Sequence, residues 1–157
     1  GLKMRGGPPE ERAKVSQRLL RQLGLDDAGH LLPHQLSGGM QQRVAVGRAF
    51  AQSPSLLLMD EPFGALDAIT REDVQEILAR LYESEPLTVV FVTHDVEEAL
   101  FLSDHICVLT ARPGRVQEVI EVPFPRPRRQ EVKRDPTFIN IKYKIEDLLR
   151  TQINPTR

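Results

Sequence analysis

Three segments between residues 36 and 67 decide the fold: LSGGMQQR at 36–43, SLLLMDEP at 55–62 and FGALD at 63–67. The first segment is a polar, glycine-containing helix start. The second is a short apolar run that ends in two adjacent carboxylates, Asp60 and Glu61. Phosphate and magnesium chemistry needs both features, so we interpret the rest of the chain around this stretch.

The composition sets broad limits on the protein class. The chain has 157 residues, of which 40% are hydrophobic, which is enough for one domain with a core. A formal net charge of −1 gives no argument for a nucleic-acid partner. Cys107 lies in an apolar run and is expected to be a buried, reduced thiol of a cytosolic protein. No apolar run approaches the ~18 residues of a membrane helix, which predicts a soluble or peripheral chain.

Apolar periodicity predicts alternating helices and strands. Helices are expected at about 8–23, 38–51, 67–81 and 95–103, and strands at 55–60, 87–93, 105–110 and 116–122. The runs at 55–60 and 87–93 are continuous, as in strands that are covered on both faces of a parallel sheet. The last strand is expected to return antiparallel as an edge hairpin. The element order therefore predicts an α/β fold with a parallel sheet and helices on both faces.

The composition changes at Pro123. Five prolines, nine Lys/Arg and four Asp/Glu follow up to Arg157. We interpret the basic excess as a solvated face, because few aromatic residues are interleaved with it as a nucleic-acid surface would require. An apolar stripe predicts one further helix near the end, with the positions Phe138, Ile141, Ile145, Leu148 and Leu149.

The helix start at 37–39 is a candidate anion site. Ser37 is expected to cap the helix, and Gly38 and Gly39 follow it. Free backbone N–H groups point outward there, glycine allows an anion to come close, and the helix dipole favours negative charge. A plain cap or turn is the commoner use of such a segment, so this assignment depends on the other motifs.

Two strand ends carry candidate catalytic groups. Asp60 is expected to bind magnesium, directly or through water, and Glu61 to polarise an attacking water. The alternative is that two acids simply end a strand, but adjacent carboxylates at the ligand edge of a sheet favour phosphoryl transfer. His94 closes the neighbouring strand and would lie at the same edge, where it could bind a γ-phosphate or orient the water. A lone histidine is usually structural.

These motifs together resemble those of the ATP-binding cassette (ABC) ATPases. Residues 36–43 resemble the signature motif, 55–61 the Walker B strand with its catalytic glutamate, 64–67 the D-loop and 93–95 the switch histidine motif. They occur in the order of the family and with similar spacing, within about residues 9–122. Met40 stands where many members have glutamine, which is a mild departure.

The resemblance implies a partial P-loop NTPase (RecA-like) fold together with the tail of a helical subdomain. Residues 1–53 would form the end of the helical subdomain, including the signature helix. Residues 54–122 would form the C-terminal part of the ATPase core. Residues 123–157 would form a C-terminal extension with one helix.

The resemblance also implies roles at a dimer interface. Ser37, Gly38 and Gly39 would contact the γ-phosphate of ATP held by a second ABC ATPase subunit in a head-to-tail dimer. Gln41 would support that contact, and Asp67 would cross the interface and couple the two sites.

The other implied roles belong to the chain's own nucleotide. Asp60 would hold the Mg²⁺ shell, Glu61 would be the general base, and His94 would sense the γ-phosphate. The helical segment 1–53 would touch transmembrane permease subunits, which implies a peripheral location at the cytoplasmic face of the cell membrane.

One motif of the family is missing. The phosphate-binding loop Gly-x-x-x-x-Gly-Lys-Ser/Thr does not occur, because Gly1 and Gly6 have the glycine spacing but Gly7 and Pro8 follow them. We therefore expect the chain to be the C-terminal portion of a longer ATPase. We also expect it to be inactive by itself, and prone to aggregate because the apolar strands at 55–60 and 87–93 would lack a cover.

The cargo and two alternatives remain open at this point. Met40, the segment 61–68, the turn 110–115 and the segment 123–129 resemble the nitrate/sulfonate/taurine branch of bacterial importers. The main alternative is a non-catalytic half-domain that docks to a full ABC ATPase or a permease, although such a module has no need of Glu61 or His94. A soluble ABC protein of DNA repair or translation is less favoured, because no long coiled-coil insertion precedes Leu36.

Overall fold

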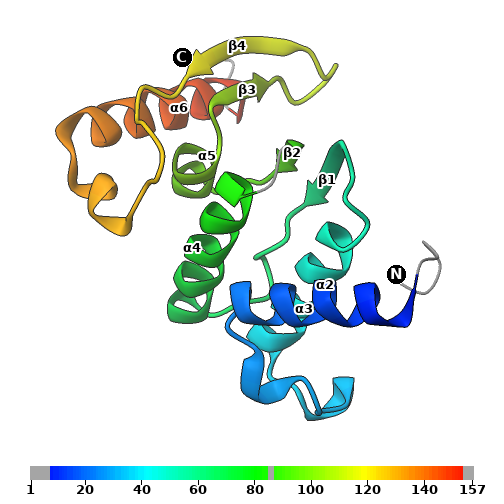
Figure 1. Cartoon of the computed structure of the whole chain (residues 1–157). Helices are drawn as coiled ribbons and strands as arrows, with labels where there is room; N and C mark the ends of the chain where they lie inside the picture. Colours follow the sequence, from blue (N-terminus) through cyan, green and yellow to red (C-terminus); the bar gives the residue numbers. More distant parts are fainter. Residues whose placement is uncertain (1–7, 85–86, 154–157) are drawn as a thin grey trace. The chain divides into compact units, whose positions relative to one another are not determined.

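The computed structural model describes residues 8–84 and 87–153. The chain divides into two compact units, Gly1–Val92 and Thr93–Arg157, which we describe one at a time (Figure 1). The boundary between them falls inside the segment 54–122 that we assigned to the ATPase core. The three-part domain assignment therefore remains a prediction based on the motifs. None of the described helices is long and apolar enough to cross a membrane.

The first unit alternates helices and strands as predicted. Its elements are α2 (Pro9–Gln22), the 3-10 turns η1 (Asp26–Ala28) and η2 (Pro33–Gln35), α3 (Gly38–Phe50), β1 (Leu56–Asp60), α4 (Ala68–Ser84) and β2 (Thr88–Val92). Proline at the first position and acids in the first turn favour the start of α2. The chain leaves this helix through Gly24, whose φ of 63° suits glycine.

Helix α3 packs on its neighbours through glycine. A Cβ on Gly39 would lie 2.4 Å from Thr70 Cγ2 of α4, and one on Gly47 would lie 2.5 Å from Leu23 Cδ1. Apolar periodicity predicts a core face made of Val44, Ala45, Ala49 and Phe50. The structure agrees only in part: Phe50 is buried, and Val44 and Ala49 are half-buried. Ala45 is exposed, and the other buried positions of the helix are Gly39, Val46 and Gly47.

Strands β1 and β2 form a parallel pair, with Leu56 opposite Thr88 and Asp60 opposite Val92. One face of the pair is covered: Met59 is buried, and the Phe91 ring lies 5.8 Å from that of Phe63. The other face is open in the described part of the chain, since Leu58 is 70% exposed. Strands covered on both faces are therefore not observed in residues 8–84 and 87–153, and the open face agrees with the expectation that the apolar strands at 55–60 and 87–93 lack a cover.

The second unit contains α5 (Val96–Leu102), β3 (His105–Leu109), β4 (Val116–Glu121), the 3-10 turn η3 (Gln130–Arg134) and α6 (Pro136–Ile153). The antiparallel return of β4 onto β3 is confirmed. Among the described residues β3 pairs with β4 alone, so the third predicted parallel strand lies in a separate two-stranded sheet.

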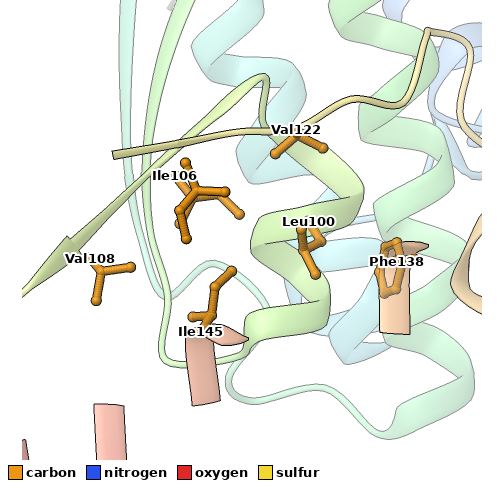
Figure 2. Packing of buried hydrophobic residues seen from close by; sticks show 7 residues of the cluster. Leu100, Ile106, Val108, Val122, Phe138 and Ile145 are labelled. Atoms are coloured by element: carbon orange, nitrogen blue, oxygen red, sulfur yellow. The ribbon is translucent and has the colours of Figure 1, made fainter. Parts of the chain in front are cut away.

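The core of the second unit lies between the β3–β4 hairpin and helices α5 and α6 (Figure 2). Its buried members are Leu100, Ile106, Val108, Ile120, Val122, Phe138 and Ile145. Alternation along β3 turns Ile106 and Val108 inward and leaves Cys107 exposed. The prediction of a buried thiol is therefore wrong. The apolar stripe predicted for the last helix is confirmed, because its five positions are buried or packed against this core.

Two arginines of the basic segment after Pro123 differ from the prediction, whereas Arg129, Arg134, Lys144 and Arg150 are exposed as predicted. Arg128 is only 7% exposed, and its guanidinium donates to the carbonyl oxygens of Leu100, Phe101 and Ser103 at 3.3, 3.2 and 2.6 Å. Arg126 donates to the carbonyl oxygen of Leu102 at 2.7 Å. The last carbonyls of a helix have no partners within it, so these two arginines cap the end of α5. They are part of the fold and not of a solvated face.

Candidate functional site

The start of α3 offers an open anion site at one glycine. Ser37 caps the helix, and its Oγ accepts a hydrogen bond from the Met40 backbone N–H at 3.3 Å. Apart from its chain neighbours and the backbone of its own helix, no atom of the described residues lies within 4 Å of the position that a Cβ on Gly38 would take, so an anion has room to approach there. Gly39 is buried against Thr70 instead. Close packing against Thr70 therefore explains why residue 39 is a glycine, and the earlier explanation, that this glycine lets an anion come close, is wrong.

Gln41 supports the loop that leads into this helix. Its Nε2 donates to the carbonyl oxygens of Pro33 at 3.2 Å and Leu36 at 3.1 Å. Both oxygens belong to the turn just before Ser37, so the side chain fixes the path of the backbone into the helix start. A role for Gln41 in phosphate contact remains a prediction.

Asp60 and Glu61 lie at the exposed carboxyl end of β1. The Glu61 backbone has a φ of 42°, in the left-handed region that costs a non-glycine residue about 1–2 kcal/mol. Hydrogen bonds hold this turn, because Glu61 N–H donates to the Val92 carbonyl at 2.8 Å and Gly64 N–H donates to the Glu61 carbonyl at 3.2 Å. Strain of this kind concentrates at functional sites, where the surrounding structure maintains it.

Helix α3 contacts the same turn through Gln42. Its Nε2 donates to the carbonyl oxygen of Pro62, the residue after Glu61. The next residue, Phe63, is fully buried. The turn that presents the two carboxylates is therefore held by β2, by α3 and by the core of the first unit.

Asp67 caps α4 close to the start of α3. Its Oδ1 accepts a hydrogen bond from the Thr70 backbone N–H at 3.0 Å. Hydrogen bonding by the Thr70 side chain and backbone lowers the pKa of the Asp67 carboxyl, which is exposed. Since Thr70 is also the residue that touches Gly39, the structure brings Asp67 and the segment Ser37–Gly39 to two adjacent helix starts.

His94 belongs to the second unit and lies between β2 and α5. It is exposed and lines a surface groove of about 550 Å³ with the start of α5 and with residues of α6 from Lys142 to Arg150. The next residue, Asp95, caps α5 by accepting hydrogen bonds from the backbone N–H groups of Glu97 at 2.8 Å and Glu98 at 3.2 Å. That His94 and Glu61 share one edge remains a prediction, because they belong to different units.

The carboxylates fit the protein's share of a magnesium site. No group of three or more His, Cys, Asp or Glu side chains gathers anywhere in the described ranges. Mg²⁺ in phosphate chemistry usually takes one or two carboxylates and completes its shell with waters and substrate phosphates. The exposed pair Asp60 and Glu61 matches that donor set, provided that the nucleotide supplies the remaining ligands.

Comparisons with known proteins agree with the motifs. The ABC transporter family model matches residues 4–64. The nitrate import ATP-binding protein NrtD of Synechococcus elongatus is 46% identical over 141 residues, which cover 88% of this chain and 52% of that protein. The taurine import ATP-binding protein TauB of Chromobacterium violaceum is 44% identical over 147 residues, covering 90% and 56%. The chain belongs to the ABC transporter ATP-binding protein family.

Solved structures of ABC proteins share the fold. The dimeric bacterial ABC transporter cassette MJ0796 superimposes with a TM-score of 0.59 at 36% identity, covering 76% of this chain and 51% of that one. The α/β class with a parallel sheet, and the partial P-loop NTPase fold, are therefore confirmed. This ABC chain spans about half the length of the curated relatives that it matches.

Two residues that hold the candidate site were not predicted from the sequence. Gln42 lies inside the quoted signature segment, but nothing in the sequence shows that its amide reaches Pro62. Thr70 follows Asp67 by three residues, the usual position for a capping partner, so its N–H bond could have been predicted. Its contact with Gly39 could not, because that contact depends on how α3 and α4 cross.

Proposed function

We propose that this chain supplies part of an ATP-hydrolysing, energy-coupling subunit of a membrane importer. The observation that carries the proposal is the turn at Glu61, where two exposed carboxylates end a parallel strand. Strand β2, helix α3 and the buried side chain of Phe63 hold the backbone of this turn. The open helix start at Gly38 belongs to the same compact unit. Carboxylates and a helix N-terminus are the two kinds of group that magnesium and phosphate require.

We assign the hydrolytic roles to residues of the strand ends. Asp60 holds the magnesium shell, and Glu61 orients the attacking water and accepts its proton. Bound magnesium would offset the charge that develops on the phosphate oxygens. His94 donates to the γ-phosphate. His94 follows Val92 by two residues, so the two Cα atoms are at most about 7.6 Å apart along the chain. Val92 is the strand partner of Asp60.

We assign the α3 start to the nucleotide of a second subunit. Ser37, Gly38 and Gly39 present N–H groups to the γ-phosphate in a head-to-tail dimer, and Gln41 keeps the preceding turn in place. Asp67 crosses the interface from the adjacent helix start. The dimeric form of the related cassette MJ0796 supports this arrangement.

The named relatives suggest the type of transport. NrtD is a nitrate import protein and TauB a taurine import protein. We propose cargo of the nitrate/sulfonate/taurine type, recognised by the permease and not by Asp60 or Glu61. In this arrangement the segment 1–53 contacts transmembrane permease subunits, the protein is peripheral at the cytoplasmic face of the membrane, and no nucleic acid takes part.

The sequence of residues 1–157 contains no Gly-x-x-x-x-Gly-Lys-Ser/Thr loop. We therefore propose that this stretch, taken alone, neither binds ATP tightly nor hydrolyses it, because the β- and γ-phosphates lack their cradle. Isothermal calorimetry of residues 1–157 should detect no binding at micromolar ATP. Micromolar affinity would contradict this part of the proposal.

The experiment for the function itself uses the full-length protein. Glu61→Gln should lower ATP turnover by about 100-fold or more, as loss of a positioned general base typically does. Glu83→Gln changes an exposed acid on α4 and should leave turnover unchanged. If Glu61→Gln retains full turnover, the hydrolytic role is wrong, and the non-catalytic docking module becomes the better account.

A further inference from the structure

A charged side chain of helix α6 pairs with the first turn of α5, three residues after His94. Lys142 Nζ of α6 donates to Glu97 Oε1, in the first turn of α5, at 2.5 Å. The side chains are partly buried, with exposed fractions of 30% for Lys142 and 39% for Glu97. The hydrogen bond to Glu97 raises the pKa of the Lys142 ammonium, which agrees with a well-formed charged pair.

Glu97 belongs to a closed hydrogen-bond network around His94. Its backbone N–H donates to Asp95 Oδ1 at 2.8 Å, and Asp95 N–H donates to Thr93 Oγ1 at 3.0 Å. The Thr93 hydroxyl donates to Glu98 Oε2 at 2.7 Å. His94 therefore lies between two residues whose side chains are both bound to the first turn of α5. A displacement of Glu97 can therefore move the backbone of His94 through Asp95, which is bonded covalently to His94 and accepts a hydrogen bond from Glu97.

The helix α6 and His94 also share a surface. The groove of about 550 Å³ is lined on one side by His94, Asp95, Val96 and Glu97 and on the other by Lys142, Glu146, Leu149 and Arg150. Glu146 lies 4.0 Å from Lys142 and 3.7 Å from Arg150, so the charges on this face of α6 alternate along the helix. The helix is anchored to the core by Phe138 and Ile145 (Figure 2).

From this juxtaposition we propose that Lys142 is a positioning residue, which lets the C-terminal helix α6 set the orientation of His94. The inference rests on the proposed role of His94 in ATP hydrolysis. Lys142 touches no nucleotide and acts through Glu97 and the α5 cap. It gives the C-terminal extension a function: the extension holds the switch histidine in its working orientation.

The variant that tests this is Lys142→Ala, with Lys142→Arg as the conservative form. Lys144→Ala is the matched control, because Lys144 makes an ion pair of the same kind from α6, but with Glu118 on β4. Arg150→Ala is the charge control, because it removes a positive charge from the same groove without breaking a contact to α5.

Two measurements on the full-length protein separate this proposal from the proposed function. Without nucleotide, NMR order parameters of the amides of residues 93–98 should fall in Lys142→Ala but not in either control. In ATPase assays Lys142→Ala should lower kcat about three- to tenfold with little change in KM, as expected for a lost coupling of ordinary size. Lys142→Arg, and the exchanged pair Glu97→Lys with Lys142→Glu, should restore most of the activity.

The proposal is overturned if Lys142→Ala leaves the order parameters unchanged, or if Lys144→Ala lowers them equally. It is also overturned if kcat falls without recovery in the exchanged pair. Failure of the hydrolytic function itself would show differently: Glu61→Gln and His94→Gln would both leave turnover intact, while the order parameters would still respond to Lys142.

Discussion

Gln42 of α3 donates its side-chain amide to the carbonyl oxygen of Pro62, the residue next to Glu61. The bond joins the helix that begins with the proposed trans phosphate contacts to the turn that carries the proposed general base. A change at one of these sites can therefore reach the other through a single side chain. We therefore expect Gln42 to couple the two proposed ATP sites to which this chain contributes.

Gln42→Ala should cause a large loss of ATP turnover and only a small loss of unfolding free energy. Loss of one partly buried hydrogen bond costs about 1 kcal/mol of unfolding free energy. Turnover of the full-length protein should fall about tenfold, because a small displacement of a catalytic group is costly. Gln17→Ala, an exposed position on α2, serves as the control and should leave both quantities unchanged. Equal turnover in the two variants would remove Gln42 from any coupling role.

Gly39→Ala tests the packing of α3 on α4. The new methyl group would lie 2.4 Å from Thr70 Cγ2, and we expect a loss of about 1–3 kcal/mol of unfolding free energy, as overpacking usually costs. Gly38→Ala is the matched control for stability, because its Cβ meets nothing within 4 Å. The double variant Gly39→Ala with Thr70→Ser should recover stability, since serine lacks the clashing methyl group. Urea unfolding measures all four proteins, and an undiminished midpoint for Gly39→Ala would refute the packing argument.

The contact between Gly39 and Thr70 marks the limit of sequence reasoning for this fold. The sequence predicts local features well: Ser37 as a cap, the helix at about 67–81 and the β3–β4 hairpin are all observed. These features depend on residues close in sequence. Periodicity also shows which faces are apolar, and the missing family motif predicts that the strand at 55–60 lacks a cover, in agreement with the exposure of Leu58. Periodicity alone cannot show which residue packs on which face, so the burial of Met59 on the opposite face appears only in the structure.

The basic segment after Pro123 shows that the burial of a polar residue is equally hard to predict from the sequence. Composition suggested a solvated face, yet Arg128 is buried because its guanidinium satisfies carbonyl groups of α5 that are more than twenty residues away. No local signal marks an arginine as a cap for a distant helix end. The residues proposed for hydrolysis are predictable in part. Their motifs predict the chemistry, whereas the positive φ of Glu61 and the hydrogen bond from Gln42 appear only in three dimensions.

Arg128→Ala should destabilise the second unit strongly. The change leaves several buried carbonyl oxygens at the end of α5 without donors, which we expect to cost about 3 kcal/mol. Arg128→Lys should recover little, because an ammonium cannot reproduce the planar fork of donors. Arg129→Ala removes an exposed neighbour and should change stability by less than about 0.5 kcal/mol. Hydrogen exchange of the α5 amides measures these effects, and equal exchange in Arg128→Ala and Arg129→Ala would contradict the capping role.

Asp104 should make the second unit less stable in acid. The hydrogen bond from Arg126, at 2.9 Å, lowers the pKa of this carboxyl below its usual value of 3.8. Because the pKa is lower in the folded state, the stabilisation is complete above the unfolded value and is lost as the pH falls through the folded value. The contribution is modest, since the side chain is 64% exposed.

Asp104→Asn should therefore lower the unfolding free energy near pH 7, with a difference from the unmodified protein that shrinks steadily below about pH 4. Asp147→Asn, an exposed acid on α6, is the control. Urea titrations between pH 2 and pH 7 measure the difference. A difference that stays constant over this range would show that the carboxylate charge of Asp104 does not stabilise the fold.

The central claim is that Ser37 and Glu61 of one chain serve different ATP sites. Mixed dimers of the full-length protein test it most directly, with Glu61→Gln in one subunit and Ser37→Arg in the other. Each variant alone should give an inactive homodimer. The mixed dimer should recover about half of the unmodified turnover, because one of its two sites combines an intact Glu61 with an intact Ser37 from the partner. A mixed dimer with no recovered turnover would mean that Ser37 and Glu61 of the same chain act in the same ATP site, which would contradict the claim.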